Sequence, residues 1–153
     1  MPDVGELAAA FHTHYVLSGG DRRDRLAAAD WAWAWEALRE AAEQPDEALA
    51  GLVDALLDLD DPHPAAYRAY LGAGVLEDSL GTGSATWGLT VAARCRSSAA
   101  WREAVAGVAL DDRMVALLPM LSTYLPQARW VPFPVAWPPA RRVVATPPPG
   151  QRR

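Results

Sequence analysis

Glu77 and Asp78 are the residues of this chain whose type and spacing come nearest to catalytic chemistry. They are adjacent carboxylates near the end of a predicted helix that also contains Gly72 and Gly74. A carboxylate pair can move protons or clamp a ligand. Interior glycine costs a helix about 1 kcal/mol, and a buried carboxylate requires a partner. Two interpretations stay open: a packing motif whose carboxylates cap helices or anchor ion pairs, and a functional acid pair.

Helical spacing predicts that Asp78 continues the core-facing stripe of this helix, with Glu77 at its edge. The stripe consists of Tyr67, Leu71, Gly74 and Asp78. Because the dipole at a helix C-terminus disfavours negative charge, we expect a compensating donor. That donor is either an arginine or the free amides of the next helix. The candidate arginines are Arg68, Arg94 and Arg96.

A second candidate site is one face of the helix predicted over residues 46–59. The apolar face of this helix contains Leu49, Leu52, Val53, Leu56 and Leu57, and the opposite face contains Glu47, Asp54, Asp58 and Asp61. Residues 41–66 include seven acidic residues and no basic one. This pattern is typical of a solvated helix face, and it also fits a docking face for a basic protein.

Several chemistries are excluded by composition. The chain has no lysine, so a phosphate-binding or Schiff-base lysine is absent. The single cysteine, Cys95, excludes an internal disulfide and a multi-cysteine metal site. His12 and His14 lie two residues apart and therefore on different helix faces. The Gly81–Ser84 turn is explained by helix caps more simply than by anion binding. We expect no metal and no cofactor, and we favour a non-catalytic protein.

The periodicity of apolar residues predicts an all-α fold of six to seven helices, arranged as a bundle or a short HEAT-like stack. The helices are expected at 3–17, 21–43, 46–59, 62–80, 84–97, from 97 or 98 onward, and 111–121. Trp31 and Trp35 share a stripe of the second helix, whereas Trp33 falls about 200° away. We favour tryptophan as core filler over an aromatic ligand pocket.

The charge of the chain is divided along its length. All 19 acidic residues lie between Asp3 and Asp112, alongside eight arginines, whereas six arginines and no acid follow from Arg113 onward. We therefore predict a helical domain over 1–125 and a proline- and arginine-rich extension over 126–153, disordered from about 146. The extension either folds back on the acidic domain or meets another partner. No membrane span or signal peptide is recognised, so a cytoplasmic location is expected.

The segment Ala73–Leu80 resembles a family of small bacterial helical proteins of unknown function, marked by Ala-Gly-Pro-Leu-Glu-Asp-Leu-Leu. The similarity extends from the tryptophan helix to about Leu121. In this chain Val75 replaces the proline of that motif, and Ser79 replaces a leucine. The resemblance implies an all-helical fold and supplies no activity.

The sequence thus favours a protein-interaction module, with the acidic face or the extension as the contact surface. One version is an immunity- or antitoxin-like protein that masks a basic partner. The alternative is a small enzyme or ligand-binding protein that uses Glu77 and Asp78 with an arginine. An open pocket that reaches either carboxylate favours the alternative, and burial of both carboxylates argues against it. Nucleic acid and membrane are not expected as partners.

Overall fold

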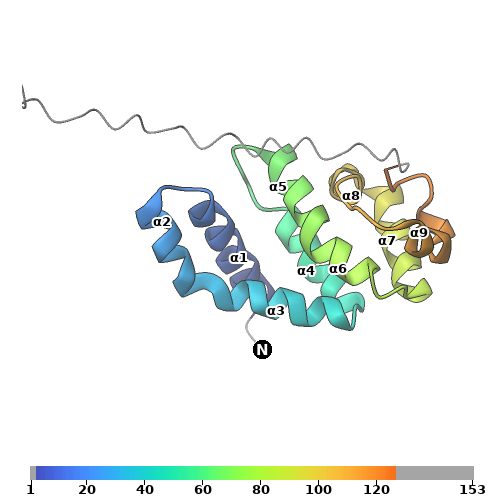
Figure 1. The fold of residues 1–153 in the computed structure, drawn as a ribbon, viewed down its shortest axis with the longest axis horizontal. Coiled ribbons are helices and arrows are strands. Elements are labelled where there is room, and N and C mark those ends of the chain that lie inside the picture. Colours follow the sequence, from blue (N-terminus) through green and yellow to red (C-terminus); the bar gives the residue numbers. More distant parts are fainter. Residues whose placement is uncertain (1–2, 127–153) are drawn as a thin grey trace, which may run out of the picture.

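The computed structural model describes residues 3–126, and within this range the chain forms helices and connecting loops without any strand (Figure 1). The predicted all-α fold is confirmed. No helix in this range is both long and apolar enough to cross a lipid bilayer. The extension predicted over 126–153, with its disorder from about 146, lies outside the described residues from 127 onward.

The first three helices form one end of the molecule. Asp3 caps α1 (Val4–Ser18), and Asp21 caps α2 (Arg22–Ala27) through a capping box. The long helix expected over 21–43 is wrong in one respect, because a 3₁₀ turn at Ala28–Trp31 separates α2 from α3 (Ala32–Glu43). The turn redirects the chain so that both helices contact α1 (Figure 1). Tertiary packing thus overrides a sequence of good helix formers.

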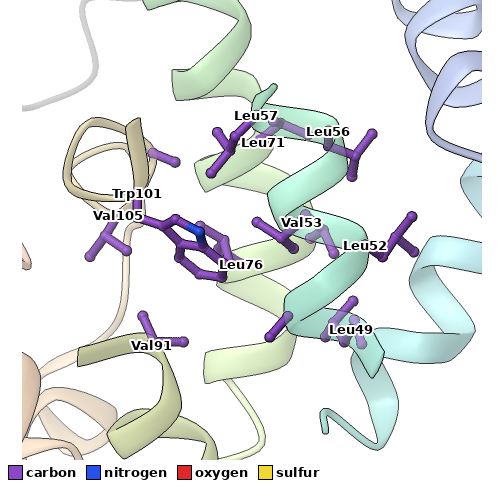
Figure 2. Packing of buried hydrophobic residues seen from close by; sticks show 14 of the residues in the cluster. Leu49, Leu52, Val53, Leu56, Leu57, Leu71, Leu76, Val91, Trp101 and Val105 are labelled. Atoms are coloured by element: carbon purple, nitrogen blue, oxygen red, sulfur yellow. The ribbon is translucent and has the colours of Figure 1, made fainter. Parts of the chain in front are cut away.

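The core is centred on α4 (Glu47–Leu57), which contacts α1 on one side and α7 on the other. Its apolar face is the one predicted from the sequence, and each of its members is buried. Figure 2 shows these side chains meeting residues of the later helices, among them Leu71, Leu76, Val91, Trp101 and Val105. Because the buried residues form one connected cluster, residues 3–126 share a single core.

The helix expected over 62–80 contains a change of helical pitch. It comprises α5 (Pro64–Leu71), a π-helical turn at Gly72–Leu76, and α6 (Glu77–Leu80). In the π turn the amide of Glu77 donates to the carbonyl of Gly72, five residues earlier. A π turn inserts one extra residue into a helix. Every side chain after it is therefore rotated by about 100° from the position that a regular α-helix gives.

The remaining helices are α7 (Ala85–Ser97), α8 (Ala99–Val105) and α9 (Asp112–Leu117), each with a side-chain cap at its start. The helix expected over 111–121 ends early, because Pro119 disfavours helical geometry at Leu118, and a 3₁₀ turn over Pro119–Leu121 follows. Ser84 accepts from the amide of Trp87, and Gly83 has a φ of +69°. Helix capping therefore accounts for the Gly81–Ser84 turn.

Gly72 and Gly107 bring α5 and α8 into close contact. A Cβ at Gly72 would overlap the carbonyl oxygen of Ala104, and one at Gly107 would lie 2.9 Å from the carbonyl oxygen of Ala69. Gly74 is less restricted, since its Cβ would meet the ring of Trp35 at 3.4 Å. The expectation that glycine serves close helix packing is confirmed at Gly72.

Candidate functional site

Asp78 faces solvent, and its expected place in the core stripe is wrong. The π turn is the reason, because it advances the buried stripe by one residue. After Tyr67 and Leu71, the buried side chains are Val75, Leu76, Ser79 and Leu80. The same rotation places the two adjacent carboxylates in different environments. Glu77 is half-buried, and its carboxylate accepts from the backbone amide of Ala109 at 2.8 Å.

None of the three candidate arginines forms an ion pair with the acid pair. Arg68 binds Glu103 at 2.7 Å, and Arg94 forms ion pairs with Glu47 and Asp54. No ion pair of Arg96 occurs within residues 3–126. Of the two expected donors, the arginine is wrong. A backbone amide does compensate Glu77, but it belongs to Ala109 in the loop after α8 and not to the helix that follows α6.

Ser79 is the residue of this segment that the sequence analysis missed. Its hydroxyl is fully buried, donates to the carbonyl of Leu76 and accepts from the indole N–H of Trp87, both at 3.0 Å. It thereby joins α6 to α7. The available signal was a serine within the apolar run that ends at Leu80, since a buried tryptophan N–H requires an acceptor.

The acidic face predicted on α4 is largely engaged within the molecule. Glu47 and Asp54 pair with Arg94, and Asp54 also accepts from the indole N–H of Trp101 at 2.7 Å. Asp61 is 8% exposed and pairs with His12. Only Asp58 of the four is both exposed and without a side-chain partner among residues 3–126. Glu47, Asp54 and Asp61 therefore connect parts of this molecule, and their carboxylates are not free to bind another protein.

Asp61 and His12 tie α1 to the loop before α5. The Nε2 atom of His12 lies 2.8 Å from one carboxylate oxygen, and the amide of His63 donates to the other at 2.7 Å. The hydrogen bond from His12 is the main cause of the lowered pKa of Asp61, which burial partly opposes. His12 thus has an intramolecular partner. No group of three or more potential metal ligands occurs within residues 3–126.

An aromatic cluster surrounds this pair. The ring of Tyr67 stands edge-on to His12 and 5.0 Å from Tyr15, which lies 4.8 Å from Tyr70. Burial raises the pKa of Tyr67 far above its usual range, and its hydroxyl has no hydrogen-bond partner among residues 3–126. The rings pack against one another, so the cluster is a core element joining α1 and α5.

Among residues 3–126, the exposed side of α3 carries the largest set of carboxylates on one helix that have no side-chain partner. We define the α3 face as Trp33, Glu36, Glu40 and Glu43. All four are exposed and follow one another at intervals of three or four residues, so they lie on one side of the helix. None of the three glutamates forms an ion pair within residues 3–126. In Figure 1, α3 runs along the lower edge of the molecule.

Trp33 is 39% exposed and Trp31 is 37% exposed, so the interpretation of these tryptophans as core filler is wrong. Only Trp35 of the three packs inward, where it stacks on Phe11 with ring centroids 5.8 Å apart. Exposed tryptophan is a frequent feature of binding surfaces, because its ring offers a large apolar area and attracts cations. The α3 face therefore has an exposed aromatic ring, that of Trp33, beside its carboxylates.

A surface pocket of about 460 Å³ lies where the ends of α3 and α6 meet. It is lined by Arg39, Ala42, Glu43, Asp78, Gly81 and Thr82. Glu43 belongs to the α3 face, so the pocket continues that face onto α6. Both helices end here, and helix C-termini carry partial negative charge. With two carboxylates against one arginine, the pocket favours a cationic group.

The spacing that creates the α3 face is visible in the sequence, but the strongest acidic excess lies in residues 41–66, which contain seven acids and no base. Arg39 interrupts the acidic run in α3, and only the structure shows that it lies toward the pocket. Comparison of the chain with models of protein families, with curated proteins and with solved structures finds no match.

Proposed function

We propose that this chain is a non-catalytic module that binds a cationic, extended segment of a protein on its α3 face. The observation that carries the proposal is the row Glu36, Glu40 and Glu43, exposed beside Trp33 and continuing into the pocket at Asp78. Carboxylates in a row attract a basic chain, and the pocket has room for one guanidinium group. The α4 face predicted from the sequence is less suited, because three of its four acids already have side-chain partners.

The proposal is tested by calorimetric titration of the full chain with an alternating arginine–proline decapeptide at low ionic strength. We expect binding of this peptide and none of a glutamine–proline peptide. The triple variant Glu36→Gln/Glu40→Gln/Glu43→Gln should weaken binding about tenfold, since exposed ion pairs contribute about 0.5 kcal/mol each.

The matched control is Glu6→Gln/Asp58→Asn/Asp60→Asn, which changes the net charge equally at exposed positions elsewhere on the molecule. It should retain most of the affinity of the unmodified chain. Equal weakening by the two triple variants would show that only overall charge matters. Unchanged binding by the α3 variant would refute the proposed site.

The pocket supports a second candidate, in which the chain binds a small cationic molecule. Asp78 reaches this pocket, as the ligand-binding alternative required, whereas the Glu77 carboxylate is occupied by the amide of Ala109. The two carboxylates therefore do not act as one pair. Arginine methyl ester distinguishes the candidates. A small-molecule site should bind it as tightly as the decapeptide, and replacement of Glu36 and Glu40 should have no effect.

A further inference from the structure

We infer that the occupant of the α3 face is the segment 127–153 of the same chain. This inference rests on the proposed function and adds to it the identity of the bound segment. Charge is the first argument. Residues 3–126 contain 19 acids against nine arginines, whereas residues 127–153 contain five arginines and no acid. Two oppositely charged segments on one chain meet at a high effective concentration.

Side-chain chemistry is the second argument. The segment Trp130–Pro139 alternates prolines with aromatic and aliphatic residues, and Arg141 and Arg142 follow it. Proline-rich chains bind exposed aromatic rings, and neighbouring carboxylates bind their arginines. The α3 face presents this combination, because exposed Trp33 lies one turn before Glu36 and two turns before Glu40. The α4 acids have no exposed tryptophan beside them, since Trp101 is buried.

Reach is the third argument. An extended chain spans about 3.3 Å per residue, so the distance that Arg141 can cover from Pro126 is about 50 Å, whereas a domain of this size has a diameter of about 35 Å. Leu125 is buried, and it fixes the point from which the segment starts. The longest path over the surface of such a domain is about 55 Å, so the arginine pair can reach the α3 face from all but the opposite pole. The pocket end of the face is not at that pole, because a Cβ at Gly83, next to Thr82, would meet Met114 and Leu117 of α9.

In this arrangement the α3 face is occupied by residues 127–153 of the same molecule. A partner with a stronger cationic segment must displace residues 127–153, and the displaced segment then becomes free for contacts of its own. The cost of displacement reduces the apparent affinity of the partner by the fraction of molecules in which the face is free.

The experiment is a paramagnetic relaxation measurement on the full chain with a nitroxide attached through Ala140→Cys, next to the Arg141–Arg142 pair. The native thiol does not compete, because Cys95 is fully buried and burial raises the pKa of its thiol to about 11. We expect the label to broaden the amide signals of residues 33–43 and 78–82. Broadening should disappear in Glu36→Gln/Glu40→Gln/Glu43→Gln and persist in Glu6→Gln/Asp58→Asn/Asp60→Asn.

Absence of broadening on α3, or broadening that survives the α3 triple variant, would overturn the inference. So would broadening seen only when a spin-labelled copy is mixed with an isotope-labelled one, since the segment would then bind a second molecule. The proposed function is judged separately, by the decapeptide titration. Replacement of all five arginines of 127–153 by glutamine should tighten decapeptide binding about threefold. Decapeptide binding without intramolecular broadening would leave the proposed function standing and reject this inference alone.

Discussion

The hydroxyl of Ser79 accepts the indole N–H of Trp87 in a position without solvent access. Removal of this hydroxyl leaves a buried donor unsatisfied, at a cost of about 1–3 kcal/mol. We predict that Ser79→Ala lowers the free energy of unfolding by this amount, as measured by urea denaturation. Asp78→Ala is the neighbouring control, and because Asp78 is exposed its effect should stay within about 0.5 kcal/mol. A larger loss for Asp78→Ala than for Ser79→Ala would contradict the assignment.

Asp61 should make stability depend on acid pH. The hydrogen bond from His12 lowers the pKa of Asp61 in the folded chain. Its contribution is therefore complete above the unfolded pKa of about 4, and it is lost as the pH falls through the lower folded value. We predict that Asp61→Asn is less stable than the unmodified chain at about pH 6 and that this difference shrinks toward about pH 3. A difference that stays constant over this range would refute the role of the carboxylate.

Removal of the hydroxyl of Tyr67 should not destabilise the chain, in contrast to the changes at Ser79 and Asp61. Its buried hydroxyl has no partner among residues 3–126, while its ring packs against His12 and Tyr15. Tyr67→Phe keeps the ring and removes the unsatisfied group. We predict unchanged stability or a gain of up to about 1 kcal/mol in thermal unfolding. A clear loss of stability would mean that the hydroxyl has a bound partner, such as an ordered water molecule.

At the scale of elements, the contact between α5 and α8 depends on glycine. A methyl group at Gly72 would overlap the backbone of Ala104, which cannot rotate away as a side chain can. We predict that Gly72→Ala destabilises the chain by about 3 kcal/mol or more. Gly51→Ala is the control, since nothing lies within 4 Å of its added Cβ and alanine should stabilise α4 by up to about 1 kcal/mol. Similar effects of the two changes would rule out close packing as the reason for Gly72.

The start of a helix and its buried face were predictable where a single local signal determines them. The caps Asp3, Asp21 and Ser84 and the apolar face of α4 follow from residue type and spacing. The π turn did not follow, because its stability comes from packing against α8 and α3, and Gly72 and Gly74 lie within it without specifying a change of helical pitch. Every orientation predicted after Leu76 for a regular α-helix is therefore rotated, so that Asp78 is exposed and Ser79 is buried. Likewise, packing on α1 set the break before α3.

At the scale of the whole molecule, the candidate site was only partly predictable. Asp78 lines the pocket as the ligand-binding alternative required, but three of the four acids of the predicted α4 face have structural partners. The free acidic surface is formed by Glu36, Glu40 and Glu43 instead. Net charge cannot distinguish a carboxylate that joins two helices from one that faces solvent. That distinction depends on which arginine, histidine or tryptophan the fold brings near, as Arg94 does for α4.

Electrostatic binding should weaken with salt. The carboxylates of the α3 face are exposed, so mobile ions screen them over about 10 Å at 0.1 M ionic strength and about 3 Å at 1 M. We predict that decapeptide affinity falls steeply between these two concentrations, and that the α3 triple variant shows a flatter dependence. Fluorescence anisotropy of a labelled decapeptide measures both. An affinity independent of salt would indicate apolar binding to Trp33 alone.

Binding of a cationic segment to the α3 face is measured by the change in amide chemical shifts when the full chain is titrated with the arginine–proline decapeptide. We expect shifts concentrated in residues 33–43 and 78–82, with few in residues 47–58. Shifts concentrated on α4, or spread evenly over the surface, would contradict it.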